Sequence, residues 1–249
     1  MNLVRSSMLA LLMMVTTPVF ALIAMASFAL PPHARYRIIT QWTSITMWGS
    51  RWITGIRYEV RGRENMPRDA SVILCKHQSA WETMAMQRIF PPVAFVLKKE
   101  LLRVPFFGWG LAQMPIVSID RSAGIGALEQ VVQQGRELLA HGFWVVVFPE
   151  GTRVAPGHTK RYKVGGAHLA VQANACVVPV AHNAGELWPR NAFVKRPGLI
   201  TVSIGPAIDA TGLTAEEVNR RAEAWIEGEM RRISPHRYPD AQDVARSAA

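Results

Sequence analysis

His77 and Glu82, with four residues between them, are of the types that acid–base chemistry uses. They follow a short apolar run, so His77 is expected in the turn after a strand and Glu82 in the first turn of the next helix. There the carboxylate can reach one imidazole nitrogen, which fixes the tautomer and leaves the other nitrogen free as a base. The pattern indicates a catalytic pair. The alternative is a capping box of Ser79 and Glu82, in which Glu82 only secures the helix N-terminus.

A second group, Phe148-Pro149-Glu150-Gly151-Thr152-Arg153, combines a tight turn with a cation after another apolar run. Pro149 ends strand pairing, Gly151 permits close approach of a ligand, and the fork of Arg153 suits a phosphate. Three further cations follow at Lys160, Arg161 and Lys163. The group predicts a site for a small anionic molecule, and the alternative is an ordinary surface turn.

A third group begins at Lys98 and Lys99 and continues to Arg121. Between these cations lies an apolar stretch that is broken by Pro105 and Gly108. Such a stretch can place a phosphate beside a hydrophobic tail. The alternative is a solvated strand end followed by a loop that covers the core.

Alternating strands and helices are expected to position these groups. Short apolar runs rich in β-formers lie at residues 71–75, 93–97, 143–148, 177–181 and 199–204. Between them, apolar residues from Leu128 to Leu139 recur at helical spacing, and Thr214 with Glu217 forms a capping box that opens a last helix. The pattern predicts an α/β layered domain over residues 61–233 and a loose tail over 234–249.

The composition narrows the class of protein. The 249 residues carry a net charge of +10, with 49% apolar and 18% charged residues. This composition excludes a chain that is mainly disordered or mainly a nucleic-acid-binding tail. Two cysteines exclude a disulfide scaffold and a four-cysteine zinc site. Residues 1–63 hold seven arginines against one glutamate, and anionic headgroups attract such clusters. A membrane surface is therefore the expected location; the alternative is that these arginines only aid solubility.

Residues 1–60 are expected to form a pair of membrane-associated helices. Residues 8–30 carry no charge, and a helix of that length can span the roughly 30 Å hydrocarbon core or insert half-way, with a kink or a break at Pro18. A cleaved signal peptide is the alternative, although its apolar region would be unusually long. The second helix is indicated by a helically spaced stripe of Ile38, Trp42, Ile45, Trp48, Trp52 and Ile56. Trp and Arg favour the membrane interface, and a core-facing helix is the alternative.

Together these groups resemble the 1-acyl-sn-glycerol-3-phosphate acyltransferases, within the wider glycerophospholipid acyltransferase family. The resemblance covers residues 70–206 and rests on four blocks: His77-x4-Glu82, Lys98-x-Glu100-Leu101 with Pro105 and Gly108, Phe148 to Arg153, and Val178-Pro179-Val180. It implies a glycerol-3-phosphate acyltransferase-like α/β fold, a mixed sheet flanked by helices. Two positions depart from the family. Glu82 stands where Asp is usual, which changes the geometry of the pair, and Lys76 stands where Asn is frequent, which bears on substrate choice.

The resemblance implies transfer of an acyl chain from acyl-CoA or acyl-carrier protein to the sn-2 hydroxyl of lysophosphatidate, giving phosphatidate without a cofactor. His77 would be the general base, oriented by Glu82. The substrate-binding residues would be Lys98, Lys99, Arg121, Glu150, Gly151, Thr152 and Arg153. Among these, the cations would hold the phosphate, while Glu150 and Gly151 would shape the glycerol end.

The expected setting is phospholipid biosynthesis at the inner membrane, with the active site facing the cytoplasm and anionic lipids as partners. Two alternatives stay open: an acyltransferase of the same family that uses another lysolipid or glycerol 3-phosphate, and a non-catalytic, membrane-tethered anion-binding protein. No metal is expected, because no ligand spacing links His141, His158, His168 and His182. Cys75, two residues before His77, fits a buried strand residue better than a nucleophile.

Overall fold

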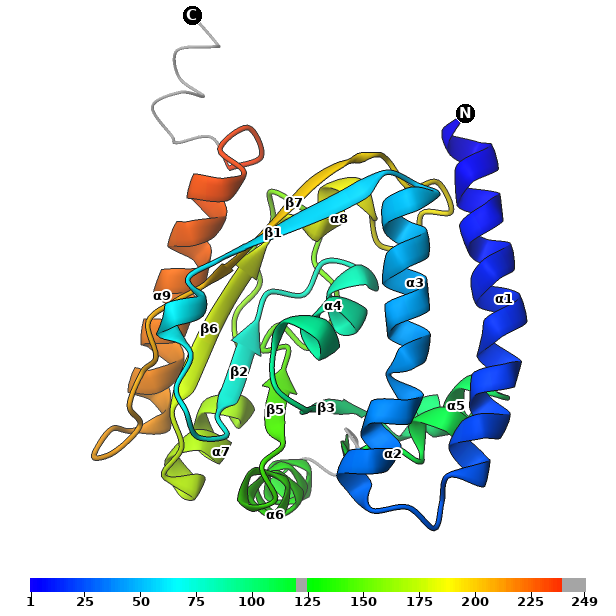
Figure 1. Ribbon diagram of the computed structural model, residues 1–249. Helices are drawn as coiled ribbons and strands as arrows, with labels where there is room; N and C mark the ends of the chain where they lie inside the picture. Colours follow the sequence, from blue (N-terminus) through cyan, green and yellow to red (C-terminus); the bar gives the residue numbers. More distant parts are fainter. Residues whose placement is uncertain (120–124, 239–249) are drawn as a thin grey trace, which may run out of the picture.

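The computed structural model describes residues 1–119 and 125–238, which form one seven-stranded sheet with helices on both faces (Figure 1). The sheet order is β1-β7-β6-β2-β5-β3-β4. Neighbouring strands run parallel, except that β6 and β7 are antiparallel. The strands are β1 (Ile56–Arg61), β2 (Val72–Cys75), β3 (Val93–Lys98), β4 (Ile116–Ile119), β5 (Trp144–Val147), β6 (Val177–His182) and β7 (Gly198–Ile204). The expected α/β fold with a mixed sheet is confirmed.

Side chains of the central strands alternate between two apolar cores, one on each face of the sheet. In β2, Ile73 and Cys75 enter one core, while Val72 and Leu74 enter the other. A strand buried on both faces reads as a continuous apolar run rather than an alternating one. This is why the central strands are visible in the sequence.

Two sets of helices cover these cores. The first face carries α1 (Asn2–Ala26), α2 (Pro32–Ile39), α3 (Gln41–Trp52), α4 (Trp81–Ile89) and α8 (Ala184–Leu187). The opposite face carries α6 (Ile125–Ala140), α7 (Gly165–Ala173) and α9 (Ala215–Ile233). The short segments are η1 (Arg63–Asn65), η2 (Lys99–Arg103) and α5 (Phe107–Leu111), of which α5 packs against α1. At the start of α9, Thr214 Oγ1 accepts the N–H of Glu217 at 3.2 Å, which is one half of the expected capping box, whereas the Glu217 carboxylate accepts from Arg220 and Arg221.

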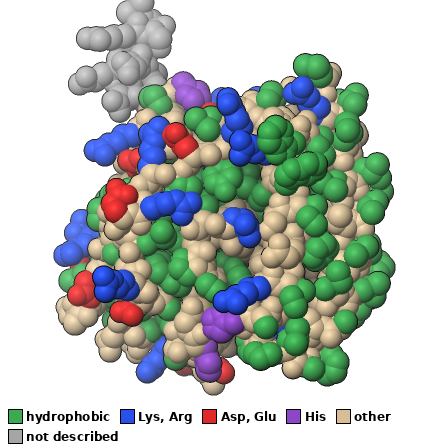
Figure 2. Space-filling model, viewed as in Figure 1, with side chains coloured by type: hydrophobic (Ala, Val, Ile, Leu, Met, Phe, Trp, Pro, Cys, Tyr) green, Lys and Arg blue, Asp and Glu red, His purple; other side chains and the backbone are tan. Residues whose placement is uncertain are grey.

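The N-terminal helix α1 continues through Pro18 and buries only four residues, Ser6, Leu9, Ala21 and Ala24. Among the described residues, α1 is the helix long and apolar enough to cross a membrane. Its outer face carries exposed Leu, Val and Met side chains, and Figure 2 shows hydrophobic side chains spread over this side of the molecule. The expected apolar helix is therefore present, and its exposed face suits a lipid environment.

The predicted second helix is wrong in its extent. Thr40 divides it into α2 and α3, and α3 ends at Trp52. Gly55, at a φ of +75°, then turns the chain into β1, so Ile56 belongs to the sheet although it matches the helical spacing. The expected boundary at residue 60 thus lies within β1 rather than between two domains.

The side of α3 that packs inward carries small residues, Thr43, Thr46, Gly49 and Ser50. A Cβ atom at Gly49 would lie 2.6 Å from Leu12 Cδ2, so the absence of a side chain there lets α1 approach closely. Trp48 and Trp52 point outward and are 58% and 65% exposed. A wholly core-facing helix is therefore wrong for these two tryptophans, and their exposure favours the membrane interface.

The start of the predicted loose tail is attached to the domain. Ser234 Oγ donates to Glu186 Oε1 at 2.5 Å, and His236 Nε2 lies 3.0 Å from the other oxygen of that carboxylate. Tyr238 is buried. Residues 234–238 are thus not loose, and residues 239–249 lie outside the described part of the chain.

Candidate active site

Strand register brings the three charged groups of the sequence to one edge of the sheet. Leu74 of β2 lies opposite Val147 of β5, and His77 and Glu150 each come three residues later. Phe95 of β3 lies opposite Val146, so Lys98 ends its strand at the same level. Because these strands are parallel, their carboxyl ends meet at the edge where α/β sheets bind ligands.

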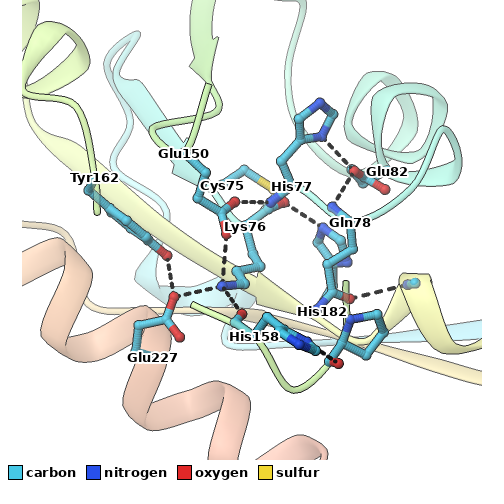
Figure 3. A network of polar contacts seen from close by, with 12 residues as sticks. Cys75, Lys76, His77, Gln78, Glu82, Glu150, His158, Tyr162, His182 and Glu227 are labelled. Carbon is cyan, nitrogen blue, oxygen red and sulfur yellow. Dashed lines mark hydrogen bonds and ion pairs between the residues drawn. The ribbon is translucent and has the colours of Figure 1, made fainter. Parts of the chain in front are cut away.

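The His77–Glu82 pair is formed. His77 Nδ1 lies 2.8 Å from Glu82 Oε1, and the same oxygen accepts the backbone N–H groups of Gln78 at 3.0 Å and Ser79 at 2.8 Å (Figure 3). Glu82 therefore secures the start of α4 and also orients the imidazole. The helix-capping contact and the contact to His77, offered as alternatives from the sequence, are both present. The side chain of Glu82 is fully buried, whereas that of His77 is 15% exposed and faces a cavity.

The charge state of Glu82 follows from its surroundings. Burial on its own would raise the pKa of Glu82, but the neighbouring His182, the hydrogen bond and charge of His77 and the N–H of Ser79 outweigh it and lower the pKa of Glu82. The carboxylate is thus ionised at neutral pH. A carboxylate beside Nδ1–H can stabilise an imidazolium, which is the form that results when Nε2 takes a proton.

Besides the bond to Glu82, two backbone hydrogen bonds and one ring contact hold His77 in place. Its backbone N–H donates to Glu150 Oε2 at 2.7 Å, and its carbonyl accepts the N–H of Val154 at 2.8 Å. Its ring stacks on Phe148, with centroids 4.0 Å apart and planes inclined by 18°. An imidazole held through its backbone and through its ring face has a fixed orientation, as a general base requires.

The cavity that His77 faces has a volume of about 900 Å³. Four cations line it beside His77: Lys98, Arg153, Lys163 and Arg190. Within residues 1–119 and 125–238, the structure pairs none of the four with a carboxylate. Unpaired cations beside a base form a site for an anionic substrate.

Two of these cations extend the predicted site. Arg190 Nη1 donates to the backbone carbonyl of Arg153 at 2.8 Å, so it secures the turn that carries Arg153. Lys163 lies against Gly151, where an added Cβ would be 3.3 Å from Nζ. Lys163 was visible in the sequence only as one of several cations, and no spacing signal could have indicated Arg190, 37 residues beyond Arg153.

The rest of the cavity is apolar and reaches the N-terminal helices. Its wall includes Phe20 and Ala21 of α1, Trp42 of α3, Leu97 of β3, Leu111 of α5 and Val131 of α6. A cavity with cations and a base at one end and apolar side chains at the other suits a phosphate ester that carries a hydrocarbon chain.

The remaining predicted residues are placed differently from one another. Gly151, at a φ of +69°, and Thr152 line the cavity. Glu150 is fully buried, with one oxygen on the His77 N–H and the other on Lys76, and it is not among the residues that line the cavity. Lys99 is exposed in η2. Arg121 lies outside the described residues.

The surroundings of Cys75 disfavour a nucleophile, and His182 is occupied by a structural hydrogen bond. Cys75 is fully buried, and burial together with Glu82 and Glu150 raises the pKa of its thiol well above the usual value, which disfavours the nucleophilic thiolate. His182 Nε2 donates to the Lys76 carbonyl at 2.8 Å, while burial lowers the pKa of His182. In the described ranges, no group of three or more His, Cys, Asp or Glu side chains is placed to hold a metal ion.

Comparison with known proteins gives consistent matches. A family model described as acyltransferase matches residues 57–183. The chain is 50% identical to a 1-acyl-sn-glycerol-3-phosphate acyltransferase of Pseudomonas aeruginosa, over 83% of this chain and 82% of that one. It is 29% identical to a protein of the same description from Cocos nucifera, over 90% and 72%. The crystal structure of the 1-acyl-sn-glycerophosphate acyltransferase of Thermotoga maritima superposes with a TM-score of 0.76 at 20% identity, covering 94% of this chain and 98% of that one.

Proposed function

The chain belongs to the acyltransferase family, and on this premise we propose that it acylates the sn-2 hydroxyl of 1-acyl-glycerol 3-phosphate to give phosphatidate. One cavity carries the proposal: the His77 imidazole, oriented by the buried carboxylate of Glu82, lies in it beside an apolar wall and four cations that pair with no carboxylate in residues 1–119 and 125–238. A lysophosphatidate molecule has the matching parts: a hydroxyl, a phosphate and one hydrocarbon chain. The name of the Pseudomonas relative points to the same acceptor.

His77 acts as the general base in this proposal. Its Nδ1–H is bonded to Glu82, so Nε2 takes the proton of the sn-2 hydroxyl as that oxygen attacks the thioester carbonyl. A new ester bond forms, the carbon–sulfur bond breaks, and the imidazolium returns its proton to the departing thiolate. Glu82 stabilises the imidazolium meanwhile. The acceptor hydroxyl is the nucleophile, so no acyl-enzyme and no cofactor is needed.

The acceptor phosphate binds at Arg153, with Lys98 beside it. Arg153 extends from a turn fixed by Gly151 and Arg190, and its Nε is buried with no hydrogen-bond partner among the residues that the structure describes. A buried, unpaired donor on a planar fork is suited to two parallel bonds to phosphate oxygens. Lys98 supplies a second charge from the end of β3.

The membrane presents the lipid substrate to this cavity. The exposed apolar face of α1, with Trp48 and Trp52 of α3, enters the lipid, and α1 side chains also form part of the cavity wall. The lysolipid therefore passes from the bilayer to His77 along apolar side chains. We place the protein at the inner membrane with the cavity open to the cytoplasm, where acyl-CoA or acyl-carrier protein is the donor.

The test is an acceptor panel with the purified protein in phospholipid vesicles. Acyl-CoA and acyl-carrier protein are each offered with lysophosphatidate, glycerol 3-phosphate or a lyso-aminolipid, and thiol release and chromatographed products are measured. Acceptor-dependent thiol release and phosphatidate with lysophosphatidate are expected. Preference for another acceptor would replace the proposed substrate. No thiol release with any acceptor would favour a non-catalytic anion-binding protein.

A further inference from the structure

Lys76 lies in a buried network of charges beside residues 76–80, the segment between β2 and α4 that carries His77 and that we call the catalytic loop. Its side chain is fully buried, and Nζ lies 2.8 Å from Glu150 Oε1 and 2.7 Å from Glu227 Oε1 (Figure 3). Tyr162 donates its hydroxyl to the same Glu227 oxygen at 2.9 Å. A third, longer bond runs from Nζ to the His158 carbonyl at 3.4 Å. An ion pair with Glu150 and hydrogen bonds to Glu227 and the His158 carbonyl thus hold the Lys76 side chain in one orientation.

The network ends at the base. Lys76 binds one oxygen of Glu150, and the other oxygen accepts the backbone N–H of His77. We propose that Lys76, Glu227 and Tyr162 are positioning residues, which act through Glu150 to hold the backbone of His77 in its catalytic orientation. This inference rests on the proposed function only for the identity of the reaction. It assigns a role in that reaction to α9, which supplies Glu227 but contributes no side chain to the cavity wall described above.

The carboxylate of Glu227 is buried, so it needs a partner for its charge. On α9 it belongs to the buried face that also carries Val218, Ala222, Ile226 and Met230. A carboxylate in such an apolar face is costly unless it is paired, and replacing a buried ion pair by apolar residues is often neutral or stabilising. Stability alone therefore gives little reason for this arrangement. The arrangement does fix a geometry: Lys76 holds one oxygen of Glu150, so the other oxygen faces the N–H of His77.

The backbone of Lys76 is held as firmly as its side chain. Its N–H donates to the Val180 carbonyl at 2.9 Å, and its carbonyl accepts from His182 Nε2 at 2.8 Å. Burial on its own would lower the pKa of Lys76, but Glu150 and Glu227 more than offset it and raise that pKa, so the ammonium is charged. Lys76 is not among the residues that line the cavity, so any effect of Lys76 on substrate choice would act through its neighbours.

Glu227→Gln tests the proposal, because it keeps the size of the side chain and removes its charge. The matched control is Glu229→Gln on the same helix, where the carboxylate accepts from Ser203 Oγ at 2.6 Å and lies 3.6 Å from Arg232 Nη1, neither of which belongs to the network. Misplacing a catalytic group by about 1 Å can cost roughly 100-fold in rate. We expect kcat of Glu227→Gln to fall about 10- to 100-fold, with KM for lysophosphatidate within about twofold, and Glu229→Gln to resemble wild type.

Two further measurements separate positioning from simple destabilisation. Lys76→Met and Tyr162→Phe are combined with Glu227→Gln, and kcat is measured well below each melting temperature. If the residues act through one path, adding Glu227→Gln to Lys76→Met lowers kcat little further. Tyr162→Phe tests the same path where Lys76→Met fails to fold. Hydrogen exchange of a peptide containing His77 should quicken in the network variants and stay unchanged in Glu229→Gln.

Wild-type kcat in Glu227→Gln, equal losses in Glu227→Gln and Glu229→Gln, additive losses within the network, or unchanged exchange at His77 would each overturn the proposal. The exchange readout requires no turnover. If wild-type protein fails to acylate lysophosphatidate, the proposed function fails, while exchange at His77 still decides whether the network holds the loop.

Discussion

Oε1 of Glu82 lies 2.8 Å from Nδ1 of His77 and accepts two backbone N–H groups as well. Glu82→Gln keeps a side-chain oxygen for those N–H groups but loses the charge that stabilises the imidazolium. We expect kcat to fall about 10²- to 10⁴-fold while the melting temperature changes little. Glu82→Asp, which keeps the charge, should retain more activity than the Gln variant. Wild-type kcat in Glu82→Gln would reduce Glu82 to a helix cap.

Removing the base is the most direct test of the chemistry. His77→Ala deletes the imidazole but leaves the backbone bonds of residue 77 to Glu150 and Val154 available. Turnover should fall about 10²- to 10⁴-fold, because general-base catalysis contributes that much. Steady-state rates are compared alongside circular dichroism and vesicle co-sedimentation, which should match wild type. A variant with near-normal kcat would remove His77 from the mechanism.

Arg153→Lys keeps the charge and loses the planar fork. A charged hydrogen bond contributes about 1.5–3 kcal/mol, so kcat/KM for lysophosphatidate should fall roughly 10- to 150-fold. The loss should be absent for an acceptor without a phosphate, if such an acceptor reacts. Competition by inorganic phosphate, measured as an inhibition constant, should weaken in parallel. Unchanged kcat/KM for lysophosphatidate would show that the phosphate binds elsewhere.

Arg190 is expected to act on the acceptor through Arg153, whose carbonyl it binds. Arg190→Met should raise KM for lysophosphatidate about tenfold, with a smaller change in kcat, because the hydrogen bond that fixes the turn of Arg153 is lost. Arg196→Met is the matched control, since Arg196 is an exposed arginine on the same connection. Equal effects of the two substitutions would indicate only a general loss of positive charge.

Tyr36 makes stability depend on alkaline pH. Its hydroxyl oxygen accepts the N–H of Val93 at 3.1 Å, and burial raises the pKa of Tyr36 to about 12. The folded state therefore retains this proton more tightly than the unfolded state, whose tyrosine titrates near 10. Stability contributed by Tyr36 is present below pH 10 and is lost as pH rises toward 12, by about 2–3 kcal/mol.

Tyr36→Phe should remove that dependence. The variant should be less stable than wild type at pH 8 by roughly 1–3 kcal/mol, because Val93 N–H loses its partner. Chemical unfolding measured from pH 8 to 12 should then bring the two stability curves together. Curves that stay parallel across this range would contradict the assignment.

The sequence predicted best those strands that are buried along their whole length. Strands buried on both faces form apolar runs, and the residues after them fall at the binding edge, so the central sheet and the His77–Glu82 pair were predictable. β1 was missed because it lies at the edge of the sheet, with Arg57, Glu59 and Arg61 between its apolar residues. Ile56, its first residue, also continued the helical spacing of the tryptophan stripe.

The contacts behind the site could not be predicted, because they join residues far apart in the chain. Lys76 and Glu227 are 151 positions apart, and Arg153 and Arg190 are 37 apart. No spacing rule relates such pairs, since the sheet order and the packing of α9 bring them together. Glu150 shows the same limit. Its place in a substrate-binding motif suggested contact with the ligand, but its two oxygens contact Lys76 and the backbone N–H of His77.

The pairing of β1 with β7 has a consequence for biosynthesis. Ile56 lies opposite Gly198, so about 140 residues must be translated before β1 has a neighbour. At roughly 5–20 residues per second, this takes on the order of ten seconds. During this time α1 has already left the ribosome, while β1 has an open edge whose charges discourage wrong pairing. Helix α9 emerges later still. On the proposed function, we therefore expect a product that stops before α9 to bind lipid through α1 and not to acylate lysophosphatidate.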